Sequence, residues 1–242
     1  MTTLLALDTA TEACSVALLH QGETTFSHEL ASRSHTQRIL PMVDEILAQS
    51  GIHLNQVDAI AFGRGPGSFT GVRVGTGITQ GLALGADLPV IPISNLTAMA
   101  QQAYETLGKT QVISAIDARM NEVYLTQLQA QSIEIKGQQF IQWQHLLEEQ
   151  VCPPEKAMEQ LLKQNSLEQL QQTWCKVGTG WQAYEVFKQQ QLNLDSNIEL
   201  PSAQYMLSLA LPLFLQQKYC SALEIEPIYL RNEVTWKKLP NR

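Results

Sequence analysis

The chain has few cysteines and histidines, and none of them stands at the spacing of a metal site. Its five histidines include no H-x-x-x-H or H-E-x-x-H pair, the spacing that places two ligands on one face of a helix. The four cysteines include no C-x-x-C pair, which argues against a zinc knuckle and a dense disulfide scaffold. We therefore expect no metal site, no metallopeptidase activity, and free thiols at Cys14, Cys152, Cys175 and Cys220.

The chain also lacks a long apolar segment, and its net charge is negative. Its longest apolar run, residues 205–215, contains Pro212 and is shorter than the roughly 20 residues that a bilayer-spanning helix needs. The apolar residues 4–7 are too few for a secretory signal. We expect a soluble, cytoplasmic protein of one large or two small domains that does not bind membranes. The net charge of −7 argues against broad, independent binding to RNA.

Glycine is abundant in one place, since six of the fifteen residues from 63 to 77 are glycines. The segment lies between an apolar run at 57–62, which predicts a strand, and a helical pattern that ends near Gly85. Glycines at such a junction allow close approach to a phosphate or to another backbone. Neither the Lys-Ser/Thr of a P-loop nor a G-x-G-x-x-G pattern is present. The segment therefore predicts close backbone packing, with anion binding as the alternative.

Two helices predicted in the first half carry a candidate interaction surface. Residues 34–49 begin with the capping-box pattern Ser34-x-x-Gln37 and carry an apolar stripe wide enough for a core on one side and a partner on the other. Residues 70–84 form the second helix, whose polar face is either solvated or binds a partner. The candidate interface residues are Ile39, Met42 and Ile46 on the first helix and Arg73, Thr76, Gly77 and Gln80 on the second.

The order of the predicted elements is that of an α/β protein. Three strands are followed by helix, strand, helix, strand and helix. Residues 108–110 resemble a hinge, which predicts a first half at 1–108, joined by a late helix near 203–219, and a second half at 109–242. In the second half, strands at 111–116 and 122–127 flank a turn in which Arg119 could hold an anion or form a salt bridge. Residues 129–172 are rich in glutamine and are expected to be less regular.

Several motifs, in order, resemble the bacterial TsaB (YeaZ) family. They cover the first half densely and the second half at scattered points. The motifs are LALDTAT at 5–11, HTQRILP at 35–41, GRGPGSFTGVRVG at 63–75, DARMNEVY at 117–124, VGTGW at 177–181 and YLRN at 229–232.

The resemblance implies the actin/hexokinase-like (ASKHA) fold, with two related halves of which the second is reduced. It implies a non-catalytic subunit that scaffolds or activates a TsaD-type paralogue as a heterodimer, together with a TsaE-type ATPase, and that forms a homodimer when alone. The complex is implied to transfer threonylcarbamoyl from threonylcarbamoyl-AMP to N6 of the adenosine beside the anticodon, in tRNAs reading codons that begin with A. This chain would meet tRNA through the complex and would need no cofactor.

In TsaD, a segment of the form Asn-His-x-x-x-His is implied to supply metal ligands. The matching segment here places Asn95 and Met99 at the two histidine positions. An amide and a thioether are poor ligands for hard or borderline cations. The resemblance therefore implies that this chain lacks the metal chemistry of its paralogue.

One alternative function is an ATPase or kinase of the same fold. Asp8 ends the first predicted strand, where the fold places a carboxylate near metal and phosphate, and Asp117 matches its counterpart in the second half. Gly178 lies in a short loop that would stand beside the adenine. These three residues form a candidate vestigial nucleotide site. The competing interpretation is that both aspartates cap turns.

The C-terminal tail, residues 231–242, is basic, with four cationic side chains against one glutamate. Basic residues around Trp236 suit contact with RNA phosphate or with an acidic partner surface. The competing interpretation is a frayed terminus with solvated lysines.

Overall fold

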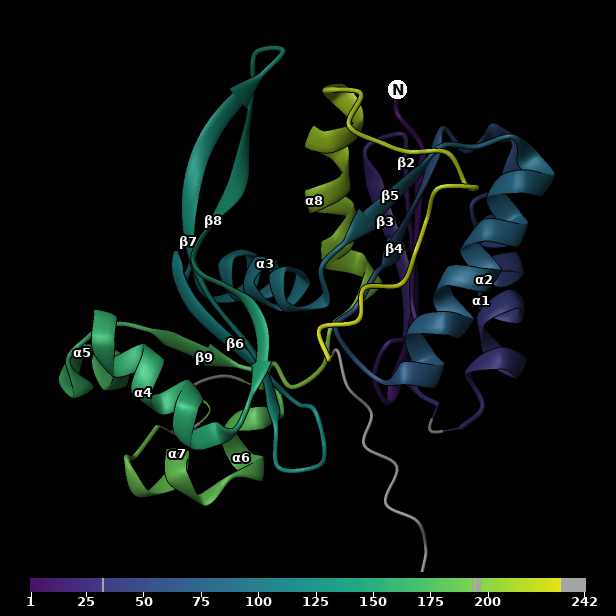
Figure 1. The fold of residues 1–242 in the computed structure, drawn as a ribbon. Coiled ribbons are helices and arrows are strands. Elements are labelled where there is room, and N and C mark those ends of the chain that lie inside the picture. The colour runs from purple at the N-terminus through teal and green to yellow at the C-terminus, as the bar shows by residue number, and fades with distance from the viewer. Residues whose placement is uncertain (32, 193, 195–196, 232–242) are drawn as a thin grey trace, which may run out of the picture.

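Two β-sheets organise the chain, one in each half of the sequence (Figure 1). The computed structural model describes residues 1–31, 33–192, 194 and 197–231. Helices cover the outer face of each sheet, and two further helices lie between the sheets (Figure 1). The predicted α/β class is confirmed.

The first sheet is mixed, with a parallel centre and an antiparallel hairpin at one side. Strand β1 pairs antiparallel with β2 and parallel with β4. Both β1 and β4 are short apolar runs that are buried along their whole length, as expected of strands covered on both faces. In sheet order the strands are β3 (Glu23–Leu30), β2 (Ala13–His20), β1 (Leu4–Asp8), β4 (Ala59–Gly63) and β5 (Val90–Ile93).

Successive residues of β1 point to opposite faces of this sheet and enter two different cores. Leu5 and Leu7 pack with the helices of the outer face, whereas Leu4 and Ala6 pack with those between the sheets. The outer helices are α1 (His35–Gln49) and α2 (Phe69–Ala86), which confirms the two helices predicted there; the 3₁₀ turn η1 (Leu54–Gln56) precedes β4. The inner helices are α3 (Asn95–Leu107) and α8 (Ala203–Leu215).

The second sheet is built around a long hairpin. Strands β7 and β8 extend past β6 as a two-stranded ribbon that turns at Lys136 and Gly137, both with positive φ. This ribbon replaces the irregular structure expected from residue 129 onward. In sheet order the strands are β8 (Gln138–Cys152), β7 (Val123–Ile135), β6 (Gln111–Asp117) and β9 (Cys175–Val177). The outer helices are α4 (Pro154–Gln164), α5 (Leu167–Gln172), α6 (Gly180–Ala183) and α7 (Glu185–Gln189).

Late in the sequence, α8 returns the chain to the first half. Its buried residues Met206 and Ala210 share a core with β1, β4 and α3. The hydroxyl of Ser15 on β2 accepts a hydrogen bond from the amide of Ala203 at 2.9 Å, which fixes the start of the helix. The division at residue 108 into two domains stays a prediction. In the part of the chain that the structure describes, no helix has both the length and the apolar character to cross a bilayer.

Candidate functional site

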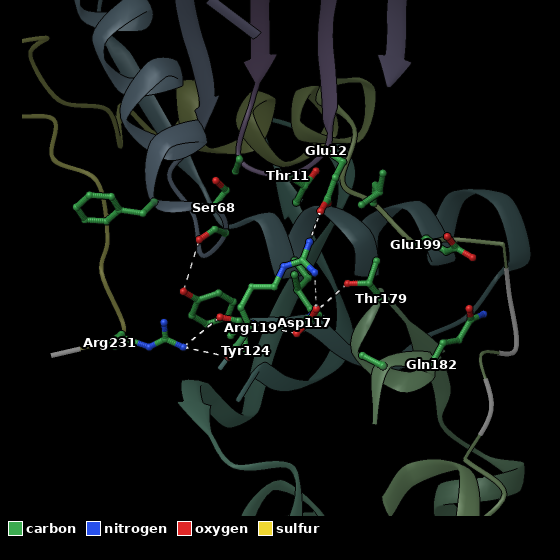
Figure 2. Close-up of a pocket in the computed structure, with 17 residues that line it drawn as sticks. Thr11, Glu12, Ser68, Asp117, Arg119, Tyr124, Thr179, Gln182, Glu199 and Arg231 are labelled. Carbon is green, nitrogen blue, oxygen red and sulfur yellow. Dashed lines mark hydrogen bonds and ion pairs between the residues drawn. The ribbon is translucent and has the colours of Figure 1, made fainter. Parts of the chain in front are cut away.

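A cleft of about 670 Å³ lies between the two halves and is the candidate site (Figure 2). One wall comes from the β1–β2 turn and the start of α2, and the other from the end of β6 and the segment around α6. The lining residues are Ala10, Thr11, Glu12, Gly67, Ser68, Phe69, Ile116, Asp117, Ala118, Arg119, Tyr124, Thr179, Gln182, Ala183, Glu199, Leu200 and Arg231.

The glycine-rich loop forms its wall by packing directly against the β1–β2 turn. A Cβ atom on Gly67 would lie 2.2 Å from the carbonyl oxygen of Ala10, and one on Gly71 would lie 2.1 Å from that of Thr9. The Thr9 hydroxyl donates a hydrogen bond to the Gly71 carbonyl at 2.8 Å. Such close contacts between backbones are possible only without a side chain. The predicted close packing is confirmed at these two glycines.

Arg119 spans the cleft. Its guanidinium contacts Glu12 on the opposite wall at 2.8 Å and Asp117 on its own wall at 3.3 Å. Arg119, Met120 and Asn121 all have positive φ, a conformation that non-glycine residues adopt only when their surroundings hold them in it. Of the two roles considered for Arg119, the structure supports the salt bridge.

Asp117 organises the second wall. Its carboxylate accepts hydrogen bonds from the hydroxyl of Tyr184 at 2.6 Å and from the amide of Arg119 at 2.9 Å. Its own amide donates to the Thr179 hydroxyl at 3.1 Å. Burial raises the pKa of Tyr184, and the hydrogen bond to Asp117 raises it further. Asp117 therefore holds the turn and the α6 segment together.

Asp8 does not reach the cleft. It is fully buried, and its Oδ1 accepts hydrogen bonds from the side-chain amide of Asn95 at 2.7 Å and from the amide of Ala10 at 3.3 Å. Its Oδ2 is buried without a hydrogen-bond partner. Burial raises the pKa of this carboxyl from 3.8 to about 6, against the lowering effect of the Asn95 hydrogen bond. The contact is so close that a Cβ on Gly63 would lie 1.9 Å from Oδ1.

Gly178 has a backbone role. Its φ is +98°, and a Cβ there would lie 2.2 Å from the carbonyl oxygen of Ala115. Its amide donates to the Ile198 carbonyl at 2.7 Å. Gly178 and Asp8 both lie outside the cleft lining. Of the candidate nucleotide-site residues Asp8, Asp117 and Gly178, the fold brings only Asp117 to the lining of the cleft, and the nucleotide site stays a prediction.

The apolar stripe of α1 faces the protein's own core. Ile39, Met42 and Ile46 are at most 1% exposed and pack with Leu5 and Leu7 of β1. Their assignment to a partner interface is wrong. A helix that covers a sheet turns its apolar stripe toward that sheet, and here the sheet covers these three side chains. The solvent-facing side of α1 carries other residues, namely Thr36, Gln37, Leu40, Pro41, Asp44, Glu45 and Ala48.

The four interface candidates on α2 have different environments. Thr76 is buried and its hydroxyl donates to the carbonyl of Val72, which corrects its assignment to the outer face. Gly77 faces open space. Arg73 and Gln80 lie on the outer side, but both contact the chain's own C-terminal segment. Sequence reasoning missed these contacts because their partners lie more than 140 residues away.

Sequence reasoning also missed Glu12, Tyr184 and Arg231 as residues of the cleft region. Arg231 donates to Glu122 and to the Ala118 carbonyl, at the turn that carries Arg119. It lies in the YLRN segment noted above, and that segment was the only signal of its role. The basic tail beyond it, with Trp236, lies outside the described residues. Among those residues no cluster of side chains could hold a metal ion.

Comparison with known proteins identifies the family. The model of the TsaD family, tRNA N6-adenosine threonylcarbamoyltransferase, matches residues 20–238. A protein of Haemophilus influenzae named tRNA threonylcarbamoyladenosine biosynthesis protein TsaB is 62% identical over 99% of this chain and 98% of its own length. This chain belongs to the TsaB family.

Two further members extend the comparison. The TsaB protein of Escherichia coli is 48% identical over 99% of each chain. The solved structure of YeaZ from Pseudomonas aeruginosa, at 43% identity, superposes with a TM-score of 0.80 over 95% of this chain and 100% of that one. Together with the TsaD-family match, these relatives confirm the actin/hexokinase-like α/β fold expected of a TsaB-family chain.

Proposed function

We propose that this chain is a non-catalytic subunit in the biosynthesis of threonylcarbamoyladenosine in tRNA. It scaffolds or activates a TsaD-type paralogue, works with a TsaE-type ATPase, and meets tRNA through that complex in the cytoplasm. The names of its full-length relatives support the pathway. The chain's own buried residues support the non-catalytic role.

The observation that carries the proposal is the environment of Asn95 and Met99. These residues occupy the positions that the resemblance assigns to metal-binding histidines in TsaD. Both are completely buried, Asn95 against Asp8 and Met99 in the core between the sheets. Side chains closed in a core cannot present ligands to a metal and a substrate. The catalytic centre of the complex is therefore assigned to the paralogue.

The charges of the cleft support the same assignment. Its two arginines, Arg119 and Arg231, are already paired with carboxylates, and its lining also contains Asp117 and Glu199. A nucleoside triphosphate would have to break these ion pairs and would bring its own negative charge close to the carboxylates of Asp117 and Glu199. An ATPase or kinase reaction in this cleft is disfavoured on that ground, and titration calorimetry with ATP and magnesium tests it.

The outer faces of α1 and α2 are the proposed pairing surface, for the paralogue or for a second copy. Exposed apolar side chains lie on both helices, with Leu40 on α1 and Leu84 on α2. A Cβ atom at Gly77 on α2 would meet nothing within 4 Å. Small and apolar residues on neighbouring helices allow close packing of a partner helix.

The experiment mixes the purified chain with its TsaD-type paralogue and measures complex formation by light scattering. With the TsaE-type ATPase, ATP, threonylcarbamoyl-AMP and tRNA added, it also measures threonylcarbamoyl transfer. The chain alone should transfer nothing, and the mixture should be active. Gly77→Arg should lower the affinity at least tenfold, since a charged side chain enters the packed surface, while Gly77→Ala serves as the matched control. Full affinity with Gly77→Arg would disprove the surface, and transfer by the chain alone would disprove the non-catalytic role.

A further inference from the structure

The last described residues, 220–231, form an extended segment, here called the strap, that crosses the first half (Figure 1). It begins at Cys220, whose amide and carbonyl both bond to Val90 on the edge strand β5 at 2.9 Å. Ala222 and Ile225 are buried in the core beneath α1 and α2. The first part of the strap is thus fixed to the sheet and to the core of the first half.

The strap next contacts the outer side of α2. The side chain of Gln80 donates to the Ala222 carbonyl at 2.9 Å. Arg73 donates from Nε to the Tyr229 hydroxyl at 2.7 Å, and its guanidinium carbon lies 3.4 Å from the centre of the Phe69 ring. This stack of a cation and two rings holds Tyr229 on the same face of α2 that is proposed to bind a partner.

The end of the strap crosses to the second half. The amide of Ile228 donates to the Arg64 carbonyl at 3.1 Å. Arg231 then donates to the Glu122 carboxylate at 2.8 Å and to the Ala118 carbonyl at 3.1 Å. Figure 2 shows Arg231 at the rim of the cleft, on the side of the turn that carries Arg119.

We propose that the strap is a clasp that couples the outer face of α2 to the turn at 117–122, and so to the cleft. Only Leu230 separates Tyr229 from Arg231, and two residues of extended chain span at most about 7 Å. A shift of the Tyr229 backbone away from α2 by more than this length therefore pulls Arg231 away from the turn. A partner that engages Arg73 on α2 favours the released strap, which loosens the wall from which Arg119 reaches Glu12.

Only the identity of that partner rests on the proposed function, because the clasp is tested on the full chain alone. The readout is hydrogen exchange, by NMR, of the amides of Ala118 and Glu122, which close the turn by donating to the carbonyls of Glu122 and Arg119 at 2.9 and 3.1 Å. Arg231→Ala removes charge-assisted bonds to this turn and should raise both exchange rates about tenfold.

The deciding variants lie at the other anchor. Arg73→Ala and Tyr229→Ala, which do not touch the turn, should each raise the same two rates at least about fivefold. Tyr229→Phe keeps the ring and should give a smaller rise. Gly77→Ala is the matched control on the same helix face, because a Cβ there meets nothing within 4 Å, and it should leave the rates unchanged. Arg73→Ala combined with Arg231→Ala should exchange no faster than Arg231→Ala alone.

The proposal is overturned if Arg231→Ala raises the exchange rates while Arg73→Ala and Tyr229→Ala leave them at the wild-type value. It is also overturned if the double variant shows the product of the two single effects, because the anchors then act independently. Arg73→Lys, which keeps the charge and removes the Nε bond, repeats the test should Arg73→Ala unfold the chain. If Gly77→Arg still pairs with the paralogue at full affinity, the proposed pairing surface is overturned. The exchange rates that test the clasp do not depend on that outcome.

Discussion

Asp8 should make the stability of this protein fall as the pH rises from mildly acidic to neutral. Its carboxyl is fully buried, with one oxygen bonded to Asn95 and the other without a partner. Burial raises its pKa from 3.8 to about 6. Between these two values the folded state holds the proton that the unfolded state has lost, so the unfolding free energy decreases with pH.

The size of the effect follows from the same pKa. A rise from 3.8 to about 6, at about 1.4 kcal/mol per pKa unit, corresponds to roughly 3 kcal/mol of lost stability above the folded-state pKa. Because part of this loss has already occurred at pH 4.5, about 2 kcal/mol of it should appear between pH 4.5 and pH 7. Other carboxylates titrate in the same range, so the effect must be measured as a difference.

Asp8→Asn supplies that difference. The amide keeps an oxygen for the bond from Asn95 and cannot ionise, so the stability of wild type relative to this variant should fall by about 2 kcal/mol between pH 4.5 and pH 7. Urea unfolding at a series of pH values measures it. Asp44→Asn, on the exposed side of α1, controls for the loss of one negative charge. A wild-type-minus-variant difference that stays constant within about 0.5 kcal/mol would refute the reasoning.

Three substitutions test packing elsewhere, all by urea or thermal unfolding. Lys176→Met should lower the unfolding free energy by about 2–3 kcal/mol, because the buried ammonium donates to backbone carbonyls, including that of Trp174 at 2.9 Å; a loss below about 0.5 kcal/mol would contradict it. Gly67→Ala should cost about 2 kcal/mol or more, since its Cβ would lie 2.2 Å from the Ala10 carbonyl oxygen, and wild-type stability would disprove the contact. Gly81→Ala meets nothing within 4 Å and should raise stability by up to about 1 kcal/mol; destabilisation would count against this helix geometry.

The elements of the first half could be predicted because local pattern decides them. The apolar run of β1 and the spacing of apolar residues in α1 and α2 survive in the structure. The capping box predicted at Ser34 and Gln37 is wrong, because the Ser34 side chain makes no capping bond to α1 and donates to the Ala31 carbonyl at 3.2 Å. The hairpin of β7 and β8 was missed for a physical reason. Its outer part pairs only within the hairpin, and of residues 130–144 only Trp143 is buried, so exposed glutamines such as Gln131 and Gln142 interrupt the alternation that marks a strand.

The candidate site was harder to predict because its geometry depends on distant contacts. A wide apolar stripe on α1 does not say which of its residues meet the sheet. In the structure Ile39, Met42, Val43, Ile46 and Leu47 all lie in the core, and Leu40 is exposed. Arg73 and Arg231 have partners that periodicity cannot reveal, since each contact joins segments more than a hundred residues apart. Asp117 lines the cleft, whereas Asp8 is buried at the end of β1, where it accepts a hydrogen bond from Asn95.

The pair of Asp8 and Asn95 explains why a carboxylate at the end of β1 need not imply chemistry. Asp8 ends β1, Gly63 ends β4 and Asn95 begins α3, so three element ends meet at one point. The side-chain amide of Asn95 donates to Asp8 Oδ1 at 2.7 Å, and neither residue lines the cleft. A buried carboxylate with an orphan oxygen costs stability, yet the same group orders the turn by accepting the amide of Ala10. Asp8 therefore positions the β1–β2 turn against the glycine-rich loop, and that packing is what gives the cleft its first wall.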